Sequence, residues 1–229
     1  MKLNNIKHVF FDLDHTLWDF DKNSELAFGD IFKKWGLRLG VQDFLKVYSS
    51  INVKYWERYR NNEVSKEALR YGRLKDSFDL LKFEATDELV NNLAEDYIEH
   101  LPKNNHLLQG TIEMLEYLKP NYRMHIITNG FEEVQRKKMT TSGIFNYFDT
   151  ITTSEEAGVK KPHSGIFEKA LAKSSAIAEN SVMIGDNYEA DIIGAEKAGL
   201  QSIYFDYYQS LHPSAMRQIK TLKELVKFL

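Results

Sequence analysis

The sequence predicts an α/β fold in which helices cover a parallel sheet and a block of helices is inserted after the first strand. In residues 1–16 and about 105–229, short apolar segments alternate with segments of helical spacing. Residues 19–103 show helical spacing but no convincing strand. Strands that alternate with helices are joined by right-handed crossovers, which produce a parallel sheet.

Five short apolar runs are predicted to form the sheet. The first, residues 6–11, is aromatic and β-branched, as is typical of a buried strand. The other four are residues 123–128, 150–153, 181–185 and 201–205. Helical spacing follows in residues 132–142, 164–174 and 189–198. Gly143 and Gly199 are placed to end two of these helices.

The inserted block is predicted to hold four helices, near residues 24–35, 43–60, 65–80 and 87–100. Ser65 and Thr86 are candidate N-caps for the third and fourth of them. We expect a core domain of residues 1–16 and 105–229. Residues 17–104 would then form a helical cap domain that acts as a lid over the ends of the strands.

Composition narrows the classes of protein. The chain has 229 residues, a formal net charge of -3 and 43% hydrophobic residues, enough for a packed interior. This balance gives no reason to expect nucleic acid or a membrane as a partner. Cysteine is absent, which excludes disulfides, thiolate metal sites and a cysteine nucleophile. The sequence shows neither an apolar leader nor a run of membrane-spanning length, so we expect a cytoplasmic protein. We also expect a monomer or weak dimer.

Polar residues follow the first strand where it ends. Asp12, Asp14 and Thr16 stand at alternate positions after the apolar run. Ligands of open α/β sheets bind beyond the carboxyl ends of the strands. Two carboxylates this close repel unless a proton or a divalent metal lies between them. The alternative is an ordinary turn, in which Asp and Thr are common.

Three further strand ends carry groups of the same kind. Thr128-Asn129-Gly130 suits an anion-binding nest, although a plain strand-to-helix turn is an alternative. Lys160 and Lys161 precede Pro162 and a helix N-terminus, where either lysine is placed to neutralise an anion, unless both are merely solvated. Asp186 ends the fourth strand and is placed to complete an oxygen-only site for Mg²⁺ with Asp12 and Asp14. Together these groups are the inventory for phosphoryl transfer.

In this order the four segments resemble the motifs of the haloacid dehalogenase (HAD) superfamily of phosphatases. The subfamily is the one with a helical cap after the first strand, on a Rossmann-like core. The resemblance implies that Asp12 is the nucleophile that forms an aspartyl phosphate. It implies that Asp14 is the general acid and then the base, and that Lys161 is the catalytic lysine.

The resemblance also implies a binding role for the remaining residues. Thr128 would bind phosphate through its hydroxyl, with Asn129 backing it and Lys161 neutralising the charge. Mg²⁺ would be held by the carboxylates of Asp12 and Asp186 and by the main-chain carbonyl of Asp14. Asp191 would act through water or by orienting the lysine, although by position it is a common helix N-terminal carboxylate.

Within the superfamily the chain is similar to the house-cleaning pyrimidine 5′-nucleotidases. The similar stretches are residues 126–131 and 153–162 and, more loosely, residues 52–56, 59–63 and Arg73 in the cap. The implied substrate is a small phosphorylated metabolite, a nucleoside 5′-monophosphate. His15 departs from the family, because many relatives carry glycine there; its ring would touch the leaving group or fill the loop.

Three other functions stay open. They are a phosphosugar phosphatase or β-phosphoglucomutase-like phosphotransferase, a haloacid dehalogenase, and a non-catalytic scaffold. Aromatic and basic side chains near or in the cap are candidates to contact a base, or else pack between helices. They are Trp18, Tyr55, Trp56, Tyr59, Phe131, Arg60, Arg70 and Arg73. The helical spacing of Tyr55 with Tyr59 favours packing.

Overall fold

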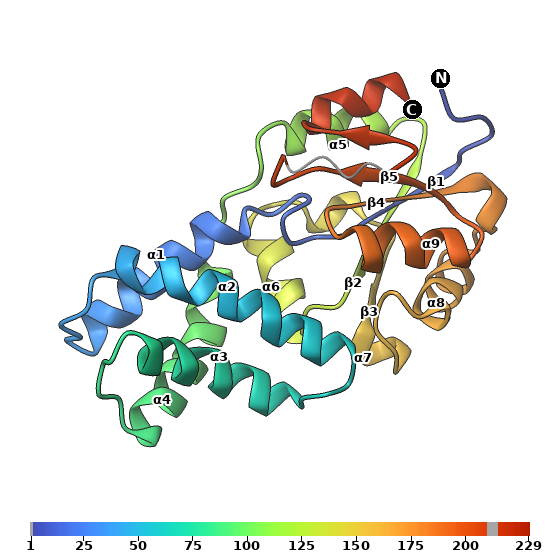
Figure 1. Cartoon of the computed structure of the whole chain (residues 1–229). Helices are drawn as coiled ribbons and strands as arrows, with labels where there is room; N and C mark the ends of the chain where they lie inside the picture. Colours follow the sequence, from blue (N-terminus) through green and yellow to red (C-terminus); the bar gives the residue numbers. More distant parts are fainter. Residues whose placement is uncertain (1, 210–214) are drawn as a thin grey trace. The chain divides into compact units, whose positions relative to one another are not determined.

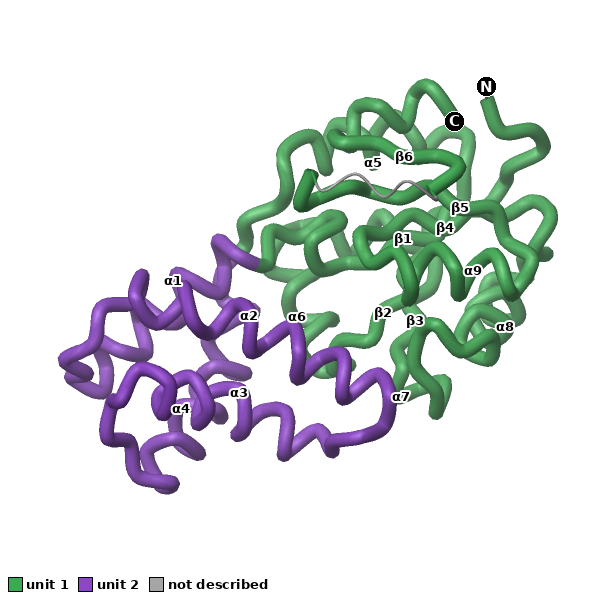
Figure 2. Tube along the Cα trace, viewed as in Figure 1, with its two compact units in different colours: residues 1–20, 105–229 green, residues 21–104 purple. Residues whose placement is uncertain are grey.

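The computed structural model describes residues 2–209 and 215–229 and divides the chain into two compact units (Figure 2). One unit contains Met1–Phe20 and Asn105–Leu229, and the other contains Asp21–Asn104. The first boundary lies four residues later than expected. The reason is that residues 17–19 pair with residues 106–108 through backbone hydrogen bonds, such as Leu108 N to Leu17 O at 2.9 Å.

The first unit is built on a parallel six-stranded sheet of order β3-β2-β1-β4-β5-β6 (Figure 1). The strands are β1 His8–Phe11, β2 Arg123–Thr128, β3 Thr150–Thr153, β4 Ser181–Gly185, β5 Gln201–Phe205 and β6 Gln218–Ile219. The first strand is two residues shorter than predicted, and β6 was not predicted. Because β1 lies between β2 and β4, the carboxyl ends of β1 to β4 are neighbours at one edge.

Helices connect the strands of this unit. They are α5 Thr111–Leu118, α6 Glu132–Thr141, α7 Ser154–Ala157, α8 Ser164–Ser174 and α9 Gly194–Lys197, with the π-helix η4 Tyr188–Ile193 before α9. Short 3-10 turns are η2 Phe145–Tyr147, η3 Ala178–Asn180 and η5 Leu222–Lys227. Gly143 and Gly199 follow α6 and α9 with φ of 74° and 85°, which confirms their predicted role. The predicted helix 189–198 is instead a π-turn followed by α9.

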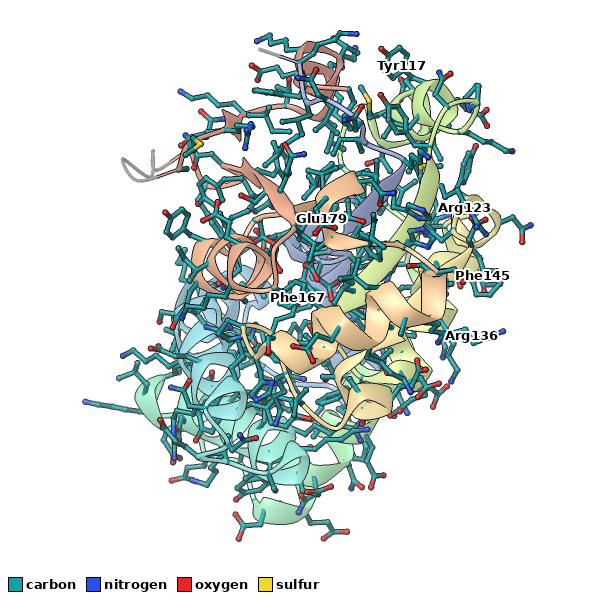
Figure 3. The ribbon with its side chains drawn as sticks, turned by 90° about the vertical axis from the view of Figure 1, so that its right-hand side faces the viewer. Tyr117, Arg123, Arg136, Phe145, Phe167 and Glu179 are labelled. Atoms are coloured by element: carbon teal, nitrogen blue, oxygen red, sulfur yellow. The ribbon has the colours of Figure 1, made fainter. Side chains whose placement is uncertain are left out.

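One face of the sheet packs against α8 and α9. Phe10 and Met183 are register partners on β1 and β4 and belong to a buried cluster with Ile127. Phe167 of α8 (Figure 3) closes this cluster from the helix side, and Ala195 of α9 belongs to it as well. These apolar side chains hold the strands, and hence the polar residues at their ends, in fixed register.

The second unit is helical. Its elements are α1 Phe20–Lys34, which begins at the unit boundary, α2 Val41–Arg60, α3 Lys66–Leu80, α4 Asp87–His100 and η1 Leu101–Lys103. The Ser65 and Thr86 hydroxyls accept hydrogen bonds from Ala68 N (3.1 Å) and Leu89 N (3.2 Å), which confirms both predicted caps. None of the helices in the described part of the chain is long and apolar enough to cross a membrane.

Two buried histidines lie side by side in the sheet. His8 Nδ1 and His125 Nε2 are 3.1 Å apart, so one shared proton joins the two rings. His125 Nδ1 lies 2.9 Å from Thr150 Oγ1. Burial, together with the repulsion of His8, lowers the pKa of His125 to about 4. The pair is therefore neutral in the folded protein at pH 7.

Acid is expected to weaken the fold through this pair. The unfolded chain protonates His125 near its ordinary pKa of about 6.5, whereas the folded chain does not until about pH 4. The stability that the neutral ring provides is full above pH 6.5 and falls by about 3 kcal/mol towards pH 4. Urea unfolding of wild type and His125→Gln between pH 7.5 and 4.5 tests this. Equal pH slopes for the two proteins would contradict it.

Candidate active site

The loop after β1 begins as a continuation of the sheet. Asp12 N donates to Ile184 O at 2.9 Å, so the nucleophile candidate is fixed to β4 as well as to β1. The chain then turns at His15, whose φ of 58° lies in the left-handed region that glycine favours. The His15 ring lies 5.0 Å from the ring of Phe20 and 4.9 Å from that of Tyr207, so it packs within an aromatic group of the same unit.

Lys161 joins the ends of three strands. Its ammonium forms ion pairs with Asp12 Oδ1 at 2.6 Å and Asp191 Oδ1 at 2.7 Å, and donates to Ile127 O at 2.8 Å. The side chain is 3% exposed. Burial alone would lower the pKa of Lys161, but the two carboxylates raise it above its ordinary value. The lysine is therefore a fixed positive charge at this edge.

Asn129 holds the segment that carries the lysine. Its amide Nδ2 donates to Lys161 O at 3.0 Å, and its Oδ1 accepts from Lys161 N at 2.8 Å. The peptide bond between Lys161 and Pro162 is cis. Asn129 thus faces the lysine backbone with both ends of its amide, and its contribution to the site is to position Lys161.

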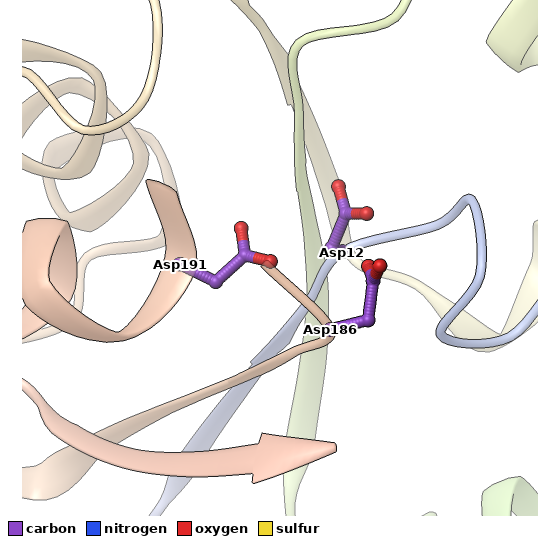
Figure 4. A group of neighbouring side chains, drawn as sticks. All are labelled: Asp12, Asp186 and Asp191. Carbon is purple, nitrogen blue, oxygen red and sulfur yellow. The ribbon is translucent and has the colours of Figure 1, made fainter. Parts of the chain in front are cut away.

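Three carboxylates gather beside the lysine (Figure 4). One oxygen each of Asp12, Asp186 and Asp191 lies within 4.8 Å of the others. Thr16 Oγ1 donates to Asp186 Oδ1 at 3.3 Å. Asp191 is brought in by the π-helix, and its Oδ2 accepts from Asn187 N at 3.0 Å. A π-turn of this kind is frequent at functional sites.

The electrostatics of this group call for a cation. Burial, followed by repulsion from Asp12 and Asp191, raises the pKa of Asp186 well above its usual value. Burial also raises the pKa of Asp12 to about 7, although Lys161 opposes the shift. With all three carboxyl groups ionised, the single ammonium would leave two negative charges in excess, and the raised pKa values reflect this repulsion. Hard oxygen donors with this excess charge fit a divalent ion such as Mg²⁺.

The Asp14 carboxylate has two hydrogen-bond partners on α6. It does not join the acidic group but faces α6, where Lys138 Nζ donates to Oδ1 at 2.7 Å and Gln135 Nε2 donates to Oδ2 at 2.9 Å. Neither α6 residue was predicted. The signal was present, because both are polar at positions that share the buried face of the helix with Val134 and Met139.

Thr128 is the last residue of β2 and carries its hydroxyl at the edge of the sheet. Its Oγ1 accepts from Gly130 N at 3.0 Å and from Gln135 Nε2 at 2.8 Å. Two accepted hydrogen bonds occupy the lone pairs of a hydroxyl oxygen, so its proton is directed to a third partner. Thr128 is therefore a donor at the edge where Lys161 also lies.

Several residues considered for base stacking pack within their own unit. Trp18 is buried, and the Lys138 ammonium lies 4.4 Å from the centroid of its ring. In the helical unit, Trp56 meets Tyr59 edge to face at 5.7 Å. Tyr55 donates to Asp76 at 2.8 Å. Arg73 is buried, donates to Asn52 at 2.9 Å and lies over the ring of Tyr97.

A parallel sheet with a charged cluster at the carboxyl ends of its strands is the arrangement in which α/β proteins bind their ligands. The profile of haloacid dehalogenase-like hydrolases matches residues 9–205. The chain belongs to this family of hydrolases.

Two relatives compared by sequence and one solved structure agree with this assignment. The chain is 30% identical to the pyrimidine 5′-nucleotidase YjjG of Escherichia coli over 95% of this chain and 93% of the relative. It is 31% identical to a glyceraldehyde 3-phosphate phosphatase of Pyrococcus abyssi over 88% and 82%. The magnesium-bound structure of the HAD-hydrolase YfnB from Bacillus subtilis superimposes with a TM-score of 0.88 at 25% identity, covering 98% of both chains. The chain is therefore a HAD-type phosphoric monoester hydrolase with a small phosphorylated substrate.

Proposed function

We propose that the chain hydrolyses nucleoside 5′-monophosphates, with pyrimidine nucleotides as the preferred class, through an aspartyl phosphate at Asp12. The observation that carries the proposal is the Asp12 carboxylate, which lies 2.6 Å from a buried ammonium at the edge where Thr128 can donate a proton. The relationship to YjjG across almost the whole chain supports the nucleotide as substrate.

Each of the four site residues has its own role in the proposed reaction. Lys161 and Thr128 bind the phosphate oxygens, and an oxygen of Asp12 forms a bond to phosphorus as the bond to the ester oxygen breaks. Asp14 gives its proton to the departing 5′-oxygen, which leaves as the nucleoside alcohol. Asp14 then takes a proton from water, which attacks the phosphorus and releases inorganic phosphate from Asp12.

Asp12, Asp186 and the main-chain carbonyl of Asp14 are the proposed ligands of Mg²⁺. When bound, the ion would supply positive charge to the phosphate and offset the excess of carboxylates at the site. The proposed role of Asp191 is to orient Lys161, with which it forms an ion pair at 2.7 Å. We further propose that the helical unit of residues 21–104 serves as the cap domain of the enzyme, which excludes water during the reaction.

The test is phosphate release from a panel of esters with Mg²⁺ present. We expect the highest kcat/KM for a pyrimidine nucleoside 5′-monophosphate, at least about tenfold above sugar phosphates and small alkyl phosphates, a difference of roughly 1.4 kcal/mol in transition-state binding. EDTA should abolish turnover and added Mg²⁺ should restore it. Turnover that is indifferent to metal would instead favour the dehalogenase chemistry, in which carbon is attacked.

A phosphosugar is the second candidate substrate, because the glyceraldehyde 3-phosphate phosphatase relative has the same level of sequence identity as the nucleotidase, although over a smaller share of the chain. Preference for a sugar phosphate would replace the nucleotidase assignment and leave the phosphatase assignment unchanged. Stimulation of turnover by a sugar bisphosphate would indicate a β-phosphoglucomutase-like phosphotransferase.

A further inference from the structure

We propose that Gln135 and Lys138 of α6 are positioning residues for the chemical step. Together they hold the Asp14 carboxylate in one orientation and direct the Thr128 hydroxyl towards the phosphate. The inference rests on the proposed function, in which Asp14 transfers protons and Thr128 binds the phosphate. The two residues lie three positions apart, so they share one face of the helix.

Each oxygen of Asp14 has its own donor. Lys138 Nζ lies 2.7 Å from Oδ1, and Gln135 Nε2 lies 2.9 Å from Oδ2. The carboxylate therefore cannot rotate about its terminal bond without breaking a charge-assisted hydrogen bond. The Lys138 side chain is 3% exposed and that of Asp14 is 23% exposed. The lysine is thus enclosed by protein, whereas the carboxylate that it holds remains accessible.

Lys138 is itself fixed by aromatic rings. Its ammonium lies 4.4 Å from the ring centroid of Trp18 and 5.4 Å from that of Phe20. Cation–π contacts of this length stabilise a partly desolvated ammonium and restrict its position. Arg136 lies on a different face of α6, where its guanidinium lies 4.9 Å from the centroid of the Phe145 ring (Figure 3).

Gln135 connects the proton-transfer residue to the phosphate-binding residue. Its Nε2 donates both to Asp14 Oδ2 and to Thr128 Oγ1, at 2.9 and 2.8 Å. The reverse orientation of the amide would place an oxygen against the carboxylate, so the nitrogen must face this way. Gly130 makes the contact possible, since a Cβ at this position would lie 2.4 Å from the Gln135 side chain.

A purely structural role accounts poorly for these residues. An apolar residue such as methionine would fill the space beside Trp18 without the desolvation penalty of a buried ammonium. A lysine is explained by what it does for Asp14. Truncation of its charge should therefore affect the step that needs the proton of Asp14 more than any other step.

The experiment compares two esters that differ only in the leaving group. Phenyl phosphate releases a basic phenolate that needs protonation, and 4-nitrophenyl phosphate releases a weakly basic phenolate that does not. The kcat/KM value covers the steps up to departure of the leaving group, so it isolates the acid role of Asp14 from its later base role. The variants are Lys138→Met, which keeps the packing stem, and Gln135→Met. The matched control is Lys137→Met, an exposed lysine of the same helix.

For Lys138→Met we expect kcat/KM to fall by about 100-fold on phenyl phosphate and by less than about fivefold on 4-nitrophenyl phosphate. Gln135→Met should show the same selectivity, with a higher KM for both esters because Thr128 loses a partner. Lys137→Met should stay within about twofold of wild type on both. Thermal unfolding of each variant establishes that it is folded.

Two results would overturn the positioning role. One is an equal loss on both esters in both α6 variants, as a structural defect would produce, and the other is no loss on either ester. Wild type serves as a separate check, because its failure to release phosphate from these esters and from the nucleotides would refute the proposed function itself. The comparison of variants thus tests the positioning role, and the activity of wild type separately tests the proposed function.

Discussion

Asp12→Asn is expected to reduce kcat by roughly four orders of magnitude or more while the protein remains folded. An amide cannot form the aspartyl phosphate that the proposed reaction requires. The fold should not suffer, because burial raises the pKa of Asp12 to about 7 and its charged form is therefore disfavoured in the folded state. Lys161 keeps a partner in Asp191, 2.7 Å away. Phosphate release with Mg²⁺ present measures the first effect, and urea unfolding at pH 8 without metal measures the second.

The sign of the stability change follows from the raised pKa. Above pH 7 the wild type carries a buried charge at Asp12 that the variant lacks, so the free energy of unfolding of the variant should be equal or higher there. Asp149→Asn is the control, because that carboxylate pairs with Arg123 at 2.7 Å near the opposite ends of the strands. More than 1% residual turnover in Asp12→Asn would argue against a nucleophilic role.

Lys161→Met is expected to impair both activity and stability. The substitution leaves Asp12, Asp186 and Asp191 without the one ammonium that contacts this group in the described structure. Breaking a buried ion pair from one side costs about 3–5 kcal/mol, and we expect a loss of this size at pH 8 without metal. Turnover should fall by roughly 1000-fold, since the phosphate loses a fixed positive charge.

The pH dependence of this loss separates electrostatics from packing. Below pH 7 the Asp12 carboxyl takes up a proton, so fewer negative charges oppose one another and the destabilisation by Lys161→Met should shrink. Lys160→Met provides the control, because the neighbouring lysine forms no part of the proposed site. A stability loss that stays constant from pH 8 to pH 5.5 would show that Lys161 acts through packing alone.

The strands were predictable to within two residues because buried parallel strands are continuous apolar runs that end in glycine or polar residues. Residues 181–185 illustrate this, since the run ends at Gly185 directly before Asp186. The strand β6 was not predictable. It contains two residues, and what makes it a strand is its pairing with β5 through Phe205 and Ile219, a tertiary contact without local periodicity.

The part of the candidate site that directly follows the strands was predictable from the sequence. Asp12, Lys161 and Asp186 each follow a strand, and parallel strands bring their carboxyl ends together whatever lies between them. Gln135 and Lys138 escaped detection because they lie on a helix face and their partner Asp14 is 121 and 124 residues away in the sequence. The ion pair of the Asp14 carboxylate with Lys138 joins residues that no local pattern links, so the sequence did not indicate it.

The narrow space beside Gly185 has an evolutionary consequence. A Cβ at this position would lie 2.2 Å from Asp191 Oδ2, so no larger residue fits while the aspartate keeps its place. The two positions are therefore epistatic. Position 185 can accept a larger residue only after position 191 has accepted a shorter side chain. That first substitution removes one of the two carboxylates that contact Lys161. Homologues that retain aspartate at position 191 should therefore keep glycine at position 185. Homologues with a larger residue at position 185 should also differ at position 191.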